Sequence, residues 1–260
     1  MWNTIIINPI LNLLVALYRL TGGNLGVAII SFTLVIKSLL IPATIPTLKM
    51  AKKQNDIQPE LEKIKQKFKY DKKKQAELQM ELFKKHGINP ASGCVTTIIT
   101  YVIMIAIYRV ISMFTMTEAL APLNDRIYLN SLKFGVHEVL NTRFLYLGDL
   151  TKPDPYLVIT ILTVVFQFIA TKMMMPYSKI SSKAVKQTPG QADDMVQAMQ
   201  KQNLYVMPIM FFIFGLKLPA GVMLYILTST IFQIGQTYHF SGWGGLKSWI
   251  NKLKFGKKDM

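Results

Sequence analysis

The sequence has few of the residues from which catalytic and metal sites are built. Of its 260 residues, one is cysteine and three are histidine. A single cysteine, Cys94, excludes an intrachain disulfide and a cysteine-cluster metal site. The three histidines lie far apart, without metal-ligand spacing. No glycine-rich phosphate loop or nucleophile–base pair is present. We therefore expect no enzymatic activity, no cofactor and no metal.

Charged residues are also scarce, and they are unevenly distributed. They make up 17% of the chain, against 51% hydrophobic residues, whereas a soluble domain averages about 25% charged. Apolar and charged residues form separate runs, a pattern that excludes a disordered chain and favours a membrane protein. The net charge of +16 predicts an anionic partner, such as lipid headgroups, nucleic acid or an acidic peptide.

Five apolar runs approach the roughly 20 residues that a bilayer span needs. Pro219 and Gly221 favour a tight turn between the last two. We therefore expect an all-α polytopic membrane protein with five transmembrane helices around a hydrophilic groove. The expected segments are an outer interfacial helix (1–24), a first span (25–48), a lysine-rich helical hairpin (49–92), a second span (93–117), an extracytoplasmic loop (118–154), a third span (155–176), a cytoplasmic loop (177–203), a fourth and fifth span (204–239) and a basic tail (240–260).

The basic residues predict the orientation, because cytoplasmic loops carry excess lysine and arginine. Twelve lysines lie within 49–90, and five each within 172–203 and 240–260. Only four basic residues lie within 118–153. This alternation fits five spans with the N-terminus outside and the C-terminus in the cytoplasm. With no cleavable signal in view, we expect a bacterial plasma (inner) membrane; plastid and mitochondrial membranes are the alternatives.

The first 24 residues allow two interpretations. Asparagines at 3, 8 and 12 interrupt the apolar run, and Ile6, Ile10, Leu13, Leu14 and Leu17 fall near one helical face. We expect an amphipathic helix on the outer membrane surface, followed by a break at Gly22 and Gly23. A sixth span is the alternative.

The lysine-rich segment is predicted to fold as an antiparallel pair of helices. Ile57, Leu61, Ile64 and Phe68 have heptad spacing, and a second helix is expected around Leu82 before a glycine cap. One interpretation is a solvated hairpin whose lysines keep it soluble. The other is a docking surface for anionic lipid, ribosomal RNA or a nascent chain. Since few aromatic residues are interleaved, recognition of a specific nucleic acid sequence is not expected.

Lys37 lies near the middle of the first span, where an ionised lysine costs a few kcal/mol. Snorkelling to the interface is one explanation; a polar cavity inside the bundle is the other. The spans contain no acidic residue, which weighs against a cation-coupled transporter. The candidate groove residues are Lys37, Thr33, Thr100, Gln167, Ser229, Gln233 and Gln236.

Four blocks of the chain stand out by their order and spacing. They are Leu25–Ile30 with Lys37 and Pro42; Gln58–Leu61 leading to His86–Pro90; Gly93–Cys94 with Ala106–Tyr108; and Asp149–Leu150 and Pro153–Tyr156 with Leu218–Gly221 and Leu224–Tyr225. Together these blocks resemble the YidC/Oxa/Alb family of membrane protein insertases. The family usually has an arginine where this chain has Lys37.

The resemblance implies a groove open to the cytoplasm and to lipid, closed on the outside. It implies a chaperone-like insertase for nascent membrane proteins, working without nucleotide. The ribosome, the Sec translocon and anionic lipids are the further partners expected. A small-solute transporter and a structural membrane scaffold are the alternatives.

Overall fold

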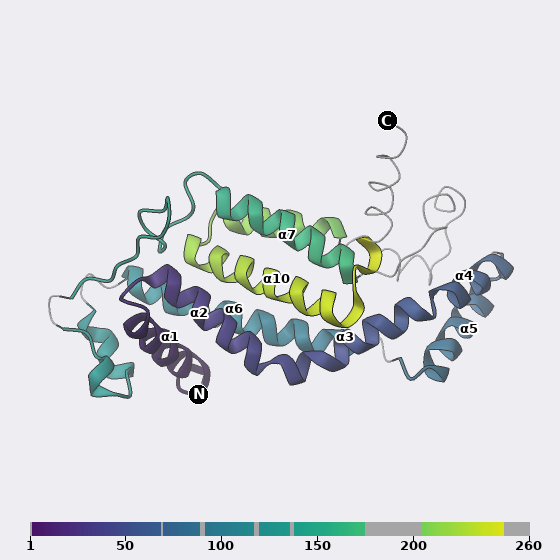
Figure 1. Ribbon diagram of the computed structural model, residues 1–260, viewed down its shortest axis with the longest axis horizontal. Helices are drawn as coiled ribbons and strands as arrows, with labels where there is room; N and C mark the ends of the chain where they lie inside the picture. The colour runs from purple at the N-terminus through teal and green to yellow at the C-terminus, as the bar shows by residue number, and fades with distance from the viewer. Residues whose placement is uncertain are drawn as a thin grey trace. The chain divides into compact units, whose positions relative to one another are not determined.

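The computed structural model describes residues 2–68, 70–88, 92–116, 120–135, 138–174 and 204–246. Within these ranges the chain is helical and contains no strand, with a single isolated bridge between Phe144 and Leu147. The predicted all-α class is confirmed for this part of the chain (Figure 1). The chain divides into two compact units. Unit 1 comprises residues 1–41, 97–166 and 209–232, and unit 2 comprises residues 42–96, 167–208 and 233–260.

Unit 1 begins with two packed helices. A π-helical turn, Asn3–Ile7, leads into α1 (Asn8–Leu20), which packs against α2 (Leu25–Leu39). The predicted break is confirmed, since Gly22 and Gly23 have φ of +78° and +72°, values that glycine adopts without steric cost. The side chain of Asn24 caps α2 by accepting a hydrogen bond from the backbone N–H of Val27 at 3.1 Å.

The face of α1 that packs on the protein shares Leu14 with the apolar face predicted for the membrane but is otherwise different. Its fully buried side chains include Leu11 and Leu14, and Ile7 of the preceding turn is fully buried as well. By contrast, Ile6 and Ile10 are only half-buried. The helix therefore has two apolar faces. The face that packs on the protein is not apparent as an apolar stripe in the sequence, because it includes a polar residue, Asn12.

The predicted first span is not one continuous helix, because it breaks at Leu40. Helix α2 ends at Leu39, and α3 runs from Ile41 to Asp56. Pro42 explains the break: it has no N–H to bond the carbonyl of Ser38, and its fixed φ suits a first helical turn. Lys37 consequently lies in the last turn of α2 rather than in the middle of a continuous helix.

Unit 1 also contains parts of two further helices, α6 (Ser92–Met116) and α7 (Val158–Met174), and of a hairpin. The hairpin consists of the helix Leu204–Gly215 and α10 (Ala220–Ser241). Residues 216–219 form the predicted turn between the last two. A Cβ on Gly221 would lie 3.1 Å from both Ile29 and Ile111, on α2 and α6. Small residues at such points let helices approach closely.

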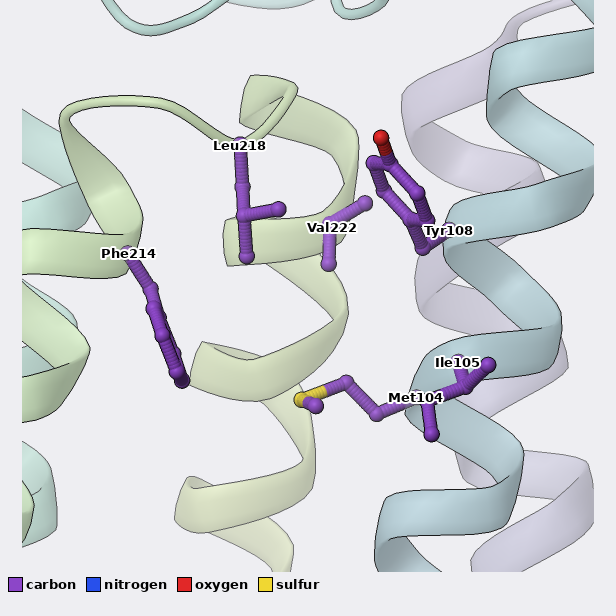
Figure 2. Close-up of a pocket in the computed structure, with 6 residues that line it drawn as sticks. All are labelled: Met104, Ile105, Tyr108, Phe214, Leu218 and Val222. Atoms are coloured by element: carbon purple, nitrogen blue, oxygen red, sulfur yellow. The ribbon is translucent and has the colours of Figure 1, made fainter.

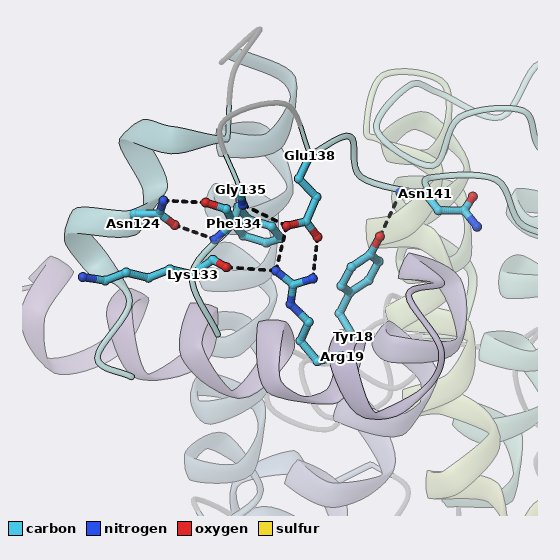
Figure 3. Close-up of polar contacts among 8 residues, drawn as sticks. All are labelled: Tyr18, Arg19, Asn124, Lys133, Phe134, Gly135, Glu138 and Asn141. Carbon is cyan, nitrogen blue, oxygen red and sulfur yellow. Dashed lines mark hydrogen bonds and ion pairs between the residues drawn. The ribbon is translucent and has the colours of Figure 1, made fainter. Parts of the chain in front are cut away.

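The connection between α6 and α7, which we call the α6–α7 connection (residues 120–135 and 138–157), packs against α1. It contains two short 3₁₀ helices, Ala121–Arg126 and Asn130–Leu132. Asn12 of α1 donates to the carbonyl of Arg126 at 2.8 Å and accepts from the N–H of Tyr128 at 2.7 Å. Figure 3 shows the adjoining contacts, in which Arg19 donates both to Glu138 and to the carbonyl of Lys133.

In unit 2 the helical hairpin forms as predicted, from α4 (Gln58–Lys67) and α5 (Lys72–Lys85). Asp71 caps α5 by accepting from the N–H of Lys74, and Gly87 follows with φ of +61°. The core of the hairpin consists of Ile57, Leu61, Leu82 and Ile88. Further along the chain, a short 3₁₀ helix, Gly244–Leu246, follows α10.

By length and composition, one run of the described residues could cross a membrane as a single helical stretch, namely Asn3–Leu20. The pair Leu25–Leu39 and Ile41–Lys53 passes the same test only if it is taken as one broken span. Three further apolar stretches are shorter: Ile98–Phe114 within α6, Val158–Met174 (α7) and Leu204–Gly215. The five-span topology and its orientation stay predictions.

Candidate functional site

Lys37 is half-buried in the last turn of the apolar helix α2. None of the three ion pairs found among the described residues includes it. Its ammonium group therefore has no anionic partner within the described part of the chain. This is the environment expected of a cation that attracts a mobile anion, and it is equally compatible with snorkelling.

Two other candidates in unit 1, Thr33 and Ser229, are buried. Thr33 is fully buried, and its hydroxyl donates to the carbonyl of Ile29 at 2.7 Å. Thr228 and Thr230 of α10 likewise donate to the carbonyls four residues earlier. Such bonds satisfy a hydroxyl inside its own helix. That Thr33 and Ser229 line a groove stays a prediction.

The glutamines near the end of α10 do meet polar partners within unit 2. The side-chain amide of Gln236 donates to the hydroxyl of Thr44 on α3 at 3.5 Å, and that of Gln233 to the sulfur of Met174 on α7 at 3.1 Å. The hydroxyl of Ser241 also donates to the carbonyl of Leu48 at 3.3 Å. The structure thus adds Thr44 as a polar neighbour in α3.

The remaining candidates, Thr100 on α6 and Gln167 on α7, are half-buried. The seven predicted residues are divided between the two units. Lys37, Thr33, Thr100 and Ser229 belong to unit 1, and Gln167, Gln233 and Gln236 belong to unit 2. Gln236 contacts the polar side chain of Thr44, which is not one of the seven, and the joint groove stays a prediction.

Unit 1 contains an apolar cavity of about 190 Å³. Figure 2 shows α6 on one side of it, and the turn before α10 with the start of α10 on the other. The side chain of Met104 extends from α6 toward α10, and the hydroxyl of Tyr108 points toward the end that holds Leu218. Its lining consists of Met104, Ile105, Tyr108, Phe214, Leu218 and Val222.

A buried carboxylate just before α7 organises the start of this helix. Asp154 is 2% exposed and accepts hydrogen bonds from the hydroxyl of Tyr146 at 2.7 Å and from the N–H of Ile159 at 2.9 Å. Burial, together with the bond to Asp154, raises the pKa of the Tyr146 hydroxyl to about 12. An acidic residue just before a helix is a usual start signal, which could have identified Asp154.

Known proteins match most of the chain. Residues 16–243 match the model of a family described as the 60 kDa inner membrane protein. The membrane protein insertase MisCA of Bacillus subtilis is 31% identical over 245 residues, which are 93% of this chain and 79% of that protein. The membrane protein insertase YidC of Fusobacterium nucleatum is 31% identical over 216 residues, 83% of this chain and 85% of that protein.

A solved structure supports the fold. It is an active YidC insertase crystal structure with the first transmembrane domain resolved, 24% identical, with a TM-score of 0.57. The match covers 86% of this chain but only 43% of that one, so this chain spans less than half of the solved protein. The family model and the two relatives carry the assignment: this chain belongs to the 60 kDa inner membrane protein family, the YidC/Oxa/Alb family of membrane protein insertases.

Proposed function

We propose that this chain is a membrane protein insertase of the bacterial inner membrane. It receives nascent hydrophobic proteins at the cytoplasmic side and releases their transmembrane segments laterally through a positively charged groove. The observation that carries the mechanism is Lys37, a cation in the last turn of an apolar helix with no anionic partner among the described residues. Its role rests on this placement together with membership of the family.

The groove would lower the cost of moving a client's polar tail across hydrocarbon, where unsatisfied polar groups cost several kcal/mol each. Lys37 would attract an acidic tail into this path. At a separation of about 8 Å and an effective dielectric of about 20, the attraction is roughly 2 kcal/mol. The Gln236–Thr44 pair supports a polar lining on the side of α3 and α10.

The short helix Leu204–Gly215 supports a second contribution. At about 1.5 Å per residue it is roughly 18 Å long, well below the ~30 Å hydrocarbon core. A short span favours local thinning of the bilayer, which shortens the path of the tail. The client's apolar segment then partitions into lipid, and this partitioning supplies the driving force. The mechanism needs no cofactor or nucleotide.

In this proposal the chain crosses the membrane five times, through α2 with the start of α3, α6, α7, Leu204–Gly215 and α10. The N-terminus lies outside and α1 lies on the outer surface. The hairpin of α4 and α5 faces the cytoplasm, and its lysines receive the client from the ribosome. The Sec translocon and anionic lipids are the other proposed partners. The alternatives, a small-solute transporter and a membrane scaffold, explain the family membership less well.

The test is insertion of a single-span client with a short acidic tail into proteoliposomes, scored by protease protection. Wild type and Lys37→Arg should insert the client. Lys37→Glu should lower the initial rate roughly thirtyfold or more, because loss of the attraction alone corresponds to about 2 kcal/mol and the carboxylate adds repulsion. Lys133→Glu makes the same charge change in the α6–α7 connection and should have little effect.

Two further measurements separate the alternatives. A client with a neutral tail should insert equally with Lys37 and with Glu at this position. A scaffold predicts that Lys37→Leu retains all function, and equal rates for Lys37→Leu and wild type would overturn the role of the charge. Failure of wild type to exceed empty liposomes would overturn the insertase itself.

A further inference from the structure

The cavity beside α6 lies among large apolar side chains that are exposed in unit 1. Ile105 is 45% exposed and Tyr108 is 40% exposed, although both belong to its lining. Phe212, Ile213 and Leu216, just before the turn, are exposed as well. In a membrane protein such a surface faces acyl chains, so the cavity opens among side chains suited to lipid contact.

The cavity suits an apolar occupant by size and chemistry. Its wall is apolar, and its volume of about 190 Å³ exceeds the ~150 Å³ of a dry apolar cavity that binds benzene. Met104 contributes a flexible, polarisable wall. A water molecule would find no polar partner inside, since the hydroxyl of Tyr108 points to one end (Figure 2). A segment of acyl chain fits both the space and the lining.

Two exposed cations flank the cavity. Arg109 directly follows Tyr108 and lies one helical turn after Ile105, on the same stripe of α6. Lys217 directly precedes Leu218 in the turn. Neither takes part in an ion pair found among the described residues. The nearby carboxylates of Asp149 and Asp154 are already engaged, by Thr151 and Lys152 and by Tyr146 and Ile159 respectively.

From this charge complementarity we propose that the cavity binds one acyl chain of an anionic phospholipid whose phosphate lies between Arg109 and Lys217. The tyrosine fits this position, because its apolar ring lines the cavity and its polar end points toward the expected headgroup. A zwitterionic lipid places the same tail in the cavity, but its headgroup has no net charge to attract. The site therefore selects lipids by headgroup charge.

The experiment uses the full chain in vesicles, with a tryptophan reporter at the cavity. Trp2, Trp243 and Trp249 are replaced by phenylalanine, and Phe214→Trp provides the reporter. Quenching is compared between phosphatidylglycerol and phosphatidylcholine, each with brominated acyl chains at the same mole fraction. Because each cation near anionic lipid strengthens association roughly fivefold, the anionic lipid should quench at several-fold lower mole fraction. The difference should shrink with rising salt.

Two matched controls isolate the site. An Ile161→Trp reporter on the exposed face of α7 should be quenched equally by both lipids. Replacing Arg109 and Lys217 by glutamine should abolish the preference at the Phe214→Trp reporter. Lys133→Gln removes a positive charge from the stretch of the α6–α7 connection that packs against α1, and it should preserve the preference.

Equal quenching by the two lipids at the cavity would overturn the proposal. So would a preference that survives the loss of both cations. If an acidic-tailed single-span peptide displaces both lipids, with no preference between them beforehand, the cavity belongs to the client instead. The vesicles contain no client in the main experiment, so its failure leaves the proposed insertase function untouched.

Discussion

The hairpin of α4 and α5 and the α6–α7 connection are held together by opposite means. The hairpin has an apolar core, in which Ile57 and Leu61 pack with Leu82 and Ile88. The α6–α7 connection instead relies on polar side chains of α1, and Asn12 alone bonds two of its backbone groups. The hairpin is therefore sensitive to lost apolar volume, and the connection to lost hydrogen-bond partners.

The largest effect is expected in the hairpin core. Leu61 is 5% exposed, and Leu61→Ala should destabilise the hairpin by about 2–5 kcal/mol through lost burial and the remaining cavity. Amide hydrogen exchange across residues 57–88 should accelerate accordingly. Met80→Ala, at a position that is 49% exposed, is the matched control and should leave exchange nearly unchanged. Equal exchange in the two variants would show that the core does not hold the hairpin.

This difference explains why one segment could be predicted in detail and the other could not. The hairpin core repeats along the chain with heptad spacing, and Pro59 and Gly87 mark its ends, so local sequence contains the information. The contacts of Asn12 join residues 114 and 116 positions apart, and no local pattern reveals such a pairing. In the sequence, Asn12 is visible only as an interruption of an apolar run.

The second prediction concerns this asparagine, which is 9% exposed. Asn12→Ala removes the partner of the Arg126 carbonyl and of the Tyr128 N–H, and because both hydrogen bonds are only partly buried the expected cost is about 1–3 kcal/mol in all. Exchange of the Tyr128 amide should accelerate, while exchange in the hairpin should not change. An effect confined to the hairpin would contradict the comparison.

Asn12→Asp refines the same test. A carboxylate keeps an acceptor for the N–H of Tyr128 but loses the amide donor to the carbonyl of Arg126. The Tyr128 amide should therefore be better protected than in Asn12→Ala. If the two variants exchange alike, the hydrogen bond to Tyr128 contributes nothing and the connection is held by its apolar contacts instead.

The candidate site was less predictable than the fold, for a physical reason. Residue types along a helix predict polar stripes, but a threonine hydroxyl can be satisfied by its own helix, as with Thr33 and Ile29. A glutamine has no such local partner of comparable geometry, so its side chain reaches another helix, as Gln236 reaches Thr44. Glutamines in apolar helices are therefore the more informative signal, and α10 contains two.

The break at Leu40 was missed for a related reason. The hydropathy of residues 25–48 is continuous, and only Pro42 signals the change from α2 to α3. Proline is frequent in the first turn of a helix and also kinks helices from within, so its presence alone did not separate one bent helix from two. The position of Lys37 relative to a helix end follows from the structure alone.

The smallest effect is expected for the exposed pair of Arg19 and Glu138, which joins α1 to the α6–α7 connection. Arg19 donates through Nη2 to Glu138 at 2.9 Å (Figure 3), and this hydrogen bond is the main reason that the pKa of Glu138 lies below its usual value. A carboxyl group whose pKa is lowered by folding stabilises the fold above its unfolded pKa of about 4.3. That contribution is lost as the pH falls through the lower folded value.

Because both side chains are about one-third exposed, the pair should contribute only about 0.2–1 kcal/mol at neutral pH. Glu138→Gln should therefore weaken the α6–α7 connection slightly at pH 7 and not at all below the folded pKa. A ¹³C titration of the Glu138 carboxyl should give a depressed pKa in wild type and a value nearer the usual one in Arg19→Gln. If Glu138→Gln destabilised the connection as much as Asn12→Ala, the exposed ion pair rather than the buried asparagine would hold the connection to α1. The difference from the hairpin would then be one between an ion pair and apolar burial.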